Sequence, residues 1–133
     1  MAFNFPVRVY YEDTDAGGVV YHANYLNFYE RARTEYLRYL GFEQDTLLAI
    51  DTAFVVRHID IDYLIAAKFN DQLTVTVSVK QLKRASIIFL QQIFDKQGNL
   101  ISQATVVVVC VNLSHMKPIA IPENITKELS RAS

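Results

Sequence analysis

The second half of the sequence contains short segments in which apolar and polar residues alternate, and these segments constrain the fold most. Residues 73–79 read Leu-Thr-Val-Thr-Val-Ser-Val, the pattern of a strand with one face on a core and the other toward solvent. Residues 86–94 and 100–111 form two further strand-like segments, and residues 95–99 between them are typical of a hairpin turn. No helical segment separates these strands, which excludes parallel crossovers between them. An antiparallel meander is therefore predicted.

One long amphipathic helix is predicted ahead of these strands. From Asn24 onward, apolar residues recur at three- and four-residue steps, and Gly41 follows the last of them as a helix-ending glycine. The helix is therefore expected over residues 24–40. Shorter elements are also expected, namely strands at residues 7–11 and 53–64 and short helices at residues 43–50 and 122–131.

The strand expected over residues 53–64 has one partly polar face. Its alternation places one set of side chains together, namely Val55, Arg57, Ile59, Ile61 and Tyr63. The opposite face carries three polar residues, His58, Asp60 and Asp62. Two prolines, Pro118 and Pro122, are expected to end the regular β structure that precedes them.

These elements predict an α+β fold in which an antiparallel sheet of about five strands packs around one long helix. The chain of 133 residues has no repeat or linker, and 51% of its residues are hydrophobic, so a single domain over residues 1–133 is expected. Such a sheet leaves two open edges, which favours pairing with another copy of the chain.

Composition excludes few functions but indicates the surroundings of the protein. The formal net charge of −1 gives no global attraction to nucleic acid or to a membrane surface. Cys110 is the single cysteine and lies in an apolar run, so it is interpreted as a buried thiol in a reducing compartment. No apolar run approaches the roughly 18 residues of a membrane span, and residues 1–6 do not have the pattern of a leader. A soluble cytoplasmic protein without membrane insertion is expected.

Carboxylates, glycines and aromatics are concentrated in residues 13–25, which read Asp-Thr-Asp-Ala-Gly-Gly-Val-Val-Tyr-His-Ala-Asn-Tyr and end at the predicted helix start. A carboxylate placed there could attack a carbonyl held against the N–H groups of the helix start, or activate water to do so. From position alone, however, an aspartate before a helix is more often a cap or a turn former.

Residues 11–25, followed by Phe-Tyr-Glu-Arg-Ala-Arg at residues 28–33, resemble the hotdog-fold acyl-CoA thioesterases of the 4-hydroxybenzoyl-CoA thioesterase family, and most closely its YbgC group. The resemblance extends over essentially the whole chain. It implies hydrolysis of acyl-CoA thioesters, with short or medium acyl groups favoured, to a free acid and coenzyme A. It also implies hotdog dimers, commonly paired into a homotetramer, with the acyl site at the junction between subunits.

The resemblance identifies Asp15 as the catalytic carboxylate and Asp13 as a neighbouring structural acid. Whether Asp15 acts as a nucleophile or as a general base stays open. The backbone N–H of His22 would polarise the thioester carbonyl, while Gly17 and Gly18 would let the substrate approach the backbone closely. The side chain of His22 could be an acid, a polar contact or simply a helix-start residue.

Further substrate contacts are expected from three parts of the chain. The aromatic residues at the helix start could border the acyl chain, and they are Tyr21, Tyr25 and Tyr29. Aromatic residues on a helix are, however, mostly core residues. By resemblance, a strand start crosses the subunit interface toward the acyl group, and it comprises Phe54, Val55, Val56 and Arg57. A basic turn would lie near the phosphates of coenzyme A, and it consists of Lys83 and Arg84.

No cofactor is expected, because coenzyme A is part of the substrate. The three histidines, His22, His58 and His115, lack metal-ligand spacing, so no metal site is expected. The absence of G-x-S-x-G argues against a serine hydrolase. Two alternatives remain open. One is a hotdog hydratase or dehydratase, and the other is a non-catalytic protein that binds acyl-CoA or acyl carrier protein, or an envelope scaffold, since YbgC relatives are linked to the Tol-Pal system.

Overall fold

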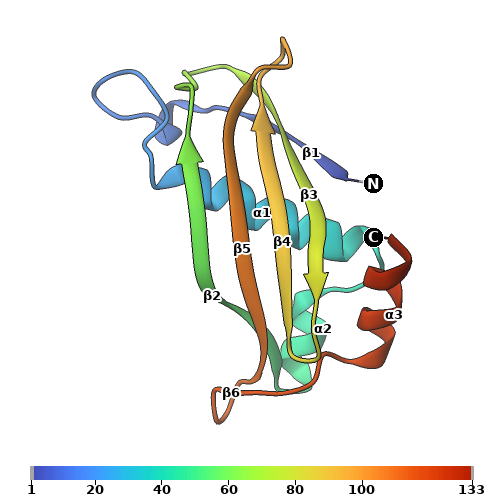
Figure 1. The fold of residues 1–133 in the computed structure, drawn as a ribbon. Coiled ribbons are helices and arrows are strands. Elements are labelled where there is room, and N and C mark those ends of the chain that lie inside the picture. Colours follow the sequence, from blue (N-terminus) through green and yellow to red (C-terminus); the bar gives the residue numbers. More distant parts are fainter. Residues whose placement is uncertain (1, 133) are drawn as a thin grey trace.

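An antiparallel sheet curls around one long helix in the computed structural model, which describes residues 2–132 (Figure 1). The strands are β1 (Phe3–Arg8), β2 (Thr52–Tyr63), β3 (Gln72–Leu82), β4 (Ser86–Phe94), β5 (Leu100–Asn112) and β6 (Lys117–Pro118). The helices are α1 (Asn24–Tyr39), α2 (Gln44–Ala49), α3 (Glu123–Ala132) and the 3-10 turn η1 (Tyr11–Asp13). The predicted meander, the long helix and the two short helices are all present. None of the helices described is long and apolar enough to cross a membrane.

The order of the strands leaves β1 and β2 at the two edges of the sheet. The order is β1-β3-β4-β5-β2, with the two-residue strand β6 beside β5, and every pair is antiparallel. β2 is 12 residues long and pairs only with β5 within residues 2–132. Its outer backbone groups can therefore pair with another chain, as expected for an open edge.

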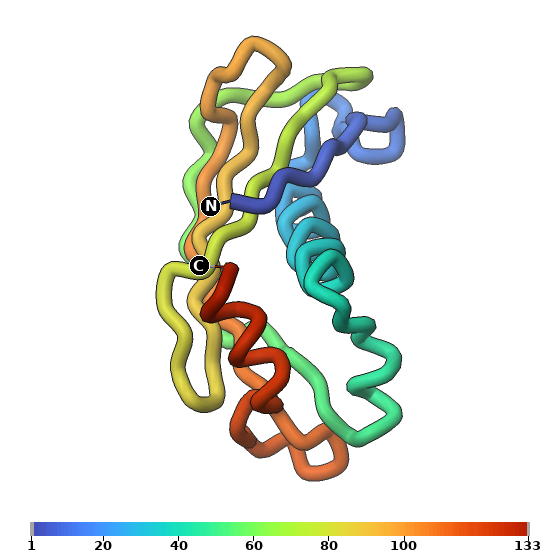
Figure 2. The backbone as a smooth tube through the Cα atoms, turned by 90° about the vertical axis from the view of Figure 1, so that its right-hand side faces the viewer, coloured from blue at the N-terminus to red at the C-terminus, as the bar shows by residue number. Residues whose placement is uncertain are grey.

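The core lies between α1 and one face of the curved sheet (Figure 2). Phe28, Tyr29 and Ala32 are fully buried on α1, and they share one core cluster with Val75 and Phe89 of the sheet. Their spacing of three and four residues is that of a helix with a single apolar face. Burial of each large apolar side chain contributes about 1.5–3 kcal/mol relative to exposure. The sheet thus holds α1 along its length.

Buried polar side chains fix the position of α1 on the sheet. The Tyr29 hydroxyl donates to Ser102 Oγ on β5 at 2.8 Å, and the Gln91 amide on β4 donates to the Tyr29 carbonyl oxygen at 3.0 Å. Arg33 donates in turn to Gln91 Oε1 at 2.9 Å. Because buried polar groups are costly when unpaired, these bonds disfavour any sliding of α1 along the strands.

The first strand differs from its prediction. The strand expected at residues 7–11 lies instead at Phe3–Arg8, and residues 11–13 form η1. The reason is the Asp13 carboxylate, which accepts a hydrogen bond from Tyr10 N–H at 2.8 Å and favours a turn over an extended chain. Pro118 is the last residue of β6, where it pairs with Val111, so the β structure ends there as expected.

The alternation expected along β2 is interrupted by a bulge at Arg57. The pairing with β5 shifts register after Val56, so the two halves of β2 are out of phase. Phe54, rather than Val55, packs against the core before the bulge, whereas Ile59 does so after it, as expected. The prediction that Val55 shares a face with Ile59 is therefore wrong.

Candidate active site

Residues 13–22 form a closed loop that leads from η1 into α1, and Asp13 lies buried at the base of this loop. Its two carboxylate oxygens accept hydrogen bonds from Tyr10 N–H at 2.8 Å and from the Asn24 side-chain amide at 2.7 Å. Tyr21 N–H donates to the Asp13 carbonyl oxygen at 2.9 Å. Asp13 therefore ties the two ends of the loop together.

Asp15 is exposed on the same loop. Its Oδ1 accepts a hydrogen bond from Gly17 N–H at 2.8 Å. Its backbone closes a tight turn, because Asp15 N–H donates to the Val19 carbonyl oxygen at 2.9 Å and Gly18 N–H donates to the Asp15 carbonyl oxygen at 3.0 Å. Oδ2 makes no hydrogen bond to any residue that the structure describes. The loop thus holds one carboxylate oxygen and leaves the other available.

The two glycines serve this turn in different ways. Gly18 has a φ of +81°, a left-handed conformation that residues with a Cβ atom adopt only at a cost. A Cβ atom on Gly17 would lie 3.2 Å from Asp15 Oδ1, which is tighter than an ordinary contact. Gly18 therefore permits the turn, and Gly17 leaves room for the carboxylate.

A short segment at residues 67–68 anchors both the loop and the helix start. Val20 N–H donates to the Ala67 carbonyl oxygen at 2.8 Å, and Val19 forms a β-bridge with Lys68. Ala67 N–H donates to the Tyr25 hydroxyl oxygen at 3.1 Å, in the first turn of α1. The Asp15 loop and α1 are therefore fixed relative to the same backbone.

The start of α1 presents free backbone N–H groups at the end of the loop. His22 N–H and Ala23 N–H make no hydrogen bond within residues 2–132, whereas Asn24 N–H donates to the Tyr21 carbonyl oxygen at 2.8 Å. Free amides at a helix start attract negative charge. The exposed His22 ring lies 4.6 Å from the Tyr21 ring and 6.2 Å from the Tyr63 ring, measured between centroids.

Two of the three tyrosines expected near the acyl chain are buried in the core of the single subunit. Tyr25 is 4% exposed and Tyr29 is fully buried, whereas Tyr21 is 49% exposed. Burial raises the pKa of the Tyr25 and Tyr29 hydroxyls above the ordinary value, and their hydrogen bonds to Ala67 and Ser102 oppose this only partly. Both hydroxyls are therefore neutral at physiological pH, and their contact with an acyl chain stays a prediction.

The other predicted contacts lie away from Asp15 within one chain. Lys83 and Arg84 are exposed at the β3–β4 turn, at the end of the sheet opposite the loop of residues 13–22 (Figure 1). The start of β2 lies toward that same distant end, and it carries Phe54, Val55, Val56 and Arg57. A single chain therefore does not bring either group to Asp15.

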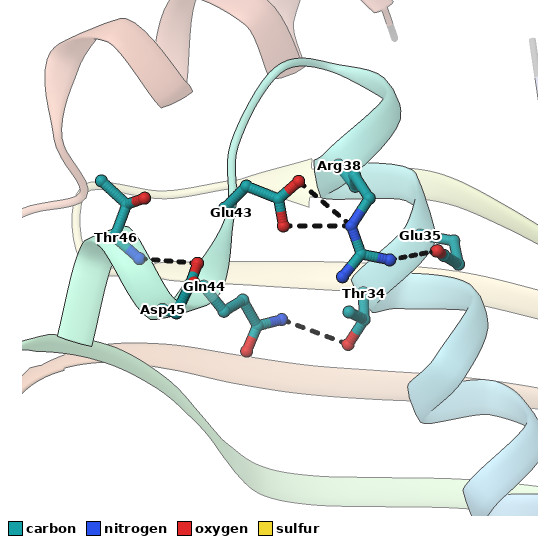
Figure 3. Close-up of polar contacts among 7 residues, drawn as sticks. All are labelled: Thr34, Glu35, Arg38, Glu43, Gln44, Asp45 and Thr46. Carbon is teal, nitrogen blue, oxygen red and sulfur yellow. Dashed lines mark hydrogen bonds and ion pairs between the residues drawn. The ribbon is translucent and has the colours of Figure 1, made fainter.

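A cavity of about 110 Å³ lies between α1, α2 and the start of β2. Phe54 and Val56 line it from β2, and Arg33 lines it from α1. The side-chain amide of Gln44 donates to Thr34 Oγ1 at 3.3 Å, and this bond links α2 to α1 at the cavity wall (Figure 3). The predicted strand start thus contributes to a pocket, although the pocket is not at Asp15 of the same chain.

Sequence reasoning missed Arg33 as a site residue. Arg33 is charged, yet it is only 8% exposed. The available signal was its spacing, because Arg33 lies four residues after Tyr29 and four before Leu37, and both of these are buried. Charge alone was therefore a poor guide to the exposure of Arg33.

Comparison with known proteins by sequence identifies a family. The thioesterase-like superfamily matches residues 9–129 of this chain. An acyl-CoA thioesterase YbgC from Haemophilus influenzae is 56% identical over 124 residues, covering 92% of this chain and 90% of its own length. An acyl-CoA thioesterase YbgC from Helicobacter pylori is 37% identical over 134 residues, covering 94% of this chain and 97% of its own length.

Comparison with solved structures gives the same fold. A probable thioesterase from Bartonella henselae has a TM-score of 0.85 at 37% identity, covering 92% of this chain and 100% of that one. A DHNA-CoA thioesterase from Staphylococcus aureus has a TM-score of 0.93 at 22% identity, covering 98% of this chain and 89% of that one, and it shows the fold alone. The curled sheet around one helix is thus a hotdog domain. The chain belongs to the thioesterase-like superfamily and, within it, to the YbgC-type acyl-CoA thioesterases.

Proposed function

We propose that this chain hydrolyses acyl-CoA thioesters to a carboxylic acid and free coenzyme A. The loop of residues 13–22 carries the proposal, because it exposes a free oxygen of Asp15 and leads directly to the free amides of His22 and Ala23. The family and the names of its YbgC members support the substrate class. A cavity of only about 110 Å³ near the start of β2 supports short or medium acyl groups over long ones.

Asp15 supplies the carboxylate in one of two routes. In the first, its free oxygen attacks the thioester carbon, the C–S bond breaks, coenzyme A leaves as a thiolate that takes a proton, and water hydrolyses the mixed anhydride. In the second, Asp15 takes a proton from a water molecule while that water attacks the same carbon, and the C–S bond then breaks as coenzyme A leaves and takes a proton. In both routes Gly17 N–H holds the second carboxylate oxygen in place.

Negative charge develops on the thioester oxygen in either route. The N–H groups of His22 and Ala23, at the positive end of the α1 dipole, are the donors that would receive this charge. In other enzymes the loss of one such donor costs about 10²–10³ in turnover. The backbone at His22, rather than its ring, therefore supports the proposed chemistry.

The complete site is proposed to form between two copies of the chain. Antiparallel pairing of two β2 edges about a two-fold axis places the start of one strand beside the end of the other. The end of β2 contacts the helix start, since the Tyr63 ring lies 6.2 Å from that of His22 and 5.4 Å from that of Tyr25. Residues 54–57 of one chain would therefore lie beside His22 of the partner subunit.

The remaining features of the proposal concern the assembly and its setting. Pairing of two such dimers into a homotetramer would let Lys83 and Arg84 of a neighbouring subunit offset the phosphates of coenzyme A. Cys110 is a buried free thiol in β5, which suits a reducing cytoplasm. Resemblance to the YbgC group supports a further link to acyl carrier protein or to the Tol-Pal system.

Asp15→Asn tests the assignment, because the amide keeps the size of the side chain but cannot act as a base or nucleophile. Thiol release from short, long and aromatic acyl-CoAs should fall about 100-fold or more, with no change in the thermal unfolding midpoint. Asp45→Asn, at an exposed carboxylate of α2, is the matched control and should keep wild-type turnover. Wild-type turnover by folded Asp15→Asn protein on every substrate contradicts the proposal. An enoyl product without free thiol would instead indicate a hydratase or dehydratase. Saturable binding of acyl-CoA without thiol release would indicate a non-catalytic binding protein.

A further inference from the structure

The cavity between α1 and the start of β2 is small, with apolar residues on its sheet side and mostly polar or charged residues, including Glu30 and Arg33, on its helix side. Phe54, Val56 and Phe89 are among the apolar side chains that line it. Its volume is about 110 Å³. Because an apolar cavity of about 150 Å³ holds benzene, this cavity has room for about four non-hydrogen atoms. It suits the end of a short chain rather than a whole substrate.

A buried cation reaches this cavity from α1. Arg33 is 8% exposed, and one of its five N–H donors bonds to Gln91 Oε1 at 2.9 Å. Gln91 is itself fully buried and held by the Tyr29 carbonyl oxygen at 3.0 Å. Since no fully buried side-chain polar atom in residues 2–132 lacks a partner, the guanidinium nitrogens without a hydrogen bond keep some exposure, and Arg33 lines the cavity.

Arg33 has no ion-pair partner within residues 2–132. No carboxylate in residues 2–132 lies within 4.0 Å of its guanidinium, and its one hydrogen-bond partner is a neutral amide. Burial lowers the pKa of Arg33, and the Glu30 carboxylate at the cavity wall opposes this only partly. Glu30 is exposed, so water screens its charge. A carboxylate entering the cavity would find paired donors with a geometry that suits it.

We propose that this cavity takes the far end of the acyl group, and that Arg33 selects acyl groups that end in a carboxylate. This rests on the proposed hydrolysis at Asp15 and on the pairing of two β2 strands. That pairing places the cavity residues Phe54 and Val56 beside His22 of the partner subunit, so the acyl group enters from the partner's helix start. The room for about four atoms fits a carboxylate with one methylene group. Glutaryl-CoA is a substrate of this kind.

Three acyl-CoAs of nearly the same shape test the proposal. Glutaryl-CoA ends in a carboxylate, its terminal amide analogue is neutral and polar, and 5-methylhexanoyl-CoA ends in two methyl groups. We expect the wild-type enzyme to hydrolyse glutaryl-CoA with a kcat/KM at least about 10-fold above that for either analogue. Equal or lower kcat/KM for glutaryl-CoA overturns the proposal, and a preference for the amide analogue would show a site for neutral polar groups instead.

Arg33→Met assigns the preference to the cation. We expect this change to lower the ratio of kcat/KM for glutaryl-CoA to kcat/KM for 5-methylhexanoyl-CoA by about 10- to 100-fold. Arg31→Met removes the same charge from an exposed position on α1 and should leave the ratio unchanged. If Arg33→Met does not fold, Arg33→Lys is measured in its place. Lysine keeps the charge but loses the paired donors, so the same ratio should fall. A wild-type ratio in the folded variant overturns the proposal.

Failure of this inference is distinguishable from failure at Asp15. Loss of thiol release in Asp15→Asn together with an unchanged ratio in Arg33→Met would retain the hydrolysis and reject the selection by Arg33. Wild-type turnover in Asp15→Asn would reject the hydrolytic role itself. In that case a preference for glutaryl-CoA would no longer support the proposed path from the partner's helix start.

Discussion

Asp13 and Asp15 are the same residue type in two different environments. Asp13 is buried and both of its carboxylate oxygens accept hydrogen bonds, so it ties the loop together. Asp15 is exposed and keeps one oxygen free. The sequence motif distinguished the two only through resemblance to a family. The hydrogen bonds now supply a physical reason, because a carboxylate with both oxygens engaged and buried is poorly placed to attack a substrate.

Gly17→Ala adds a Cβ atom 3.2 Å from Asp15 Oδ1 and pushes the carboxylate away from its place. We expect kcat/KM for acyl-CoA hydrolysis to fall by roughly 10-fold or more, because small misplacements of reacting groups are costly. Urea unfolding should show little change in stability. In Gly18→Ala the added Cβ atom meets nothing within 4 Å, so the carboxylate is not displaced. The φ of +81° at this position should instead lower the free energy of unfolding by about 1–2 kcal/mol. Wild-type kcat/KM for Gly17→Ala would refute the role given to Gly17.

The elements whose sequence pattern reflects burial on one face were predicted well. The period of α1 and the alternation of β3 each record a single buried face, and both elements lie where expected. The bulge in β2 at Arg57 was not predictable, because it depends on how β5 pairs with β2 and not on the residues of β2 alone. The first strand was misplaced because a side-chain hydrogen bond to Tyr10 N–H turns the chain before residue 11.

The bond between Tyr29 and Ser102 couples α1 to β5, and a double-mutant cycle measures this coupling. Tyr29→Phe leaves the buried Ser102 hydroxyl without its partner, and Ser102→Ala does the same to the Tyr29 hydroxyl. We expect each change to lower the free energy of unfolding by about 1–2 kcal/mol, and the double variant to cost less than the sum. Urea unfolding of the four proteins gives the coupling energy. Strict additivity would show that this bond does not hold the helix to the sheet.

The whole molecule places parts of the proposed site at opposite ends of the sheet. Asp15 and the helix start lie at one end, while the start of β2 and Lys83–Arg84 lie at the other (Figure 1). The sequence indicated both groups but not their separation, since that follows from strand order. It also gave no sign of the cavity at Arg33, because a cavity is a property of packing between distant segments. The proposed two-fold pairing of β2 would reunite these parts.

Subunit complementation tests most directly whether the site is shared between chains. Asp15→Asn removes the carboxylate proposed to react, and Val56→Lys blocks the start of β2, so each variant alone should have little activity. Co-folding of equal amounts should restore about a quarter of wild-type thiol release, because half of the dimers are mixed and each mixed dimer has one intact site. Activity no greater than the sum of the two parents, measured on folded mixed dimers, would contradict a site built from Asp15 of one chain and β2 of its partner.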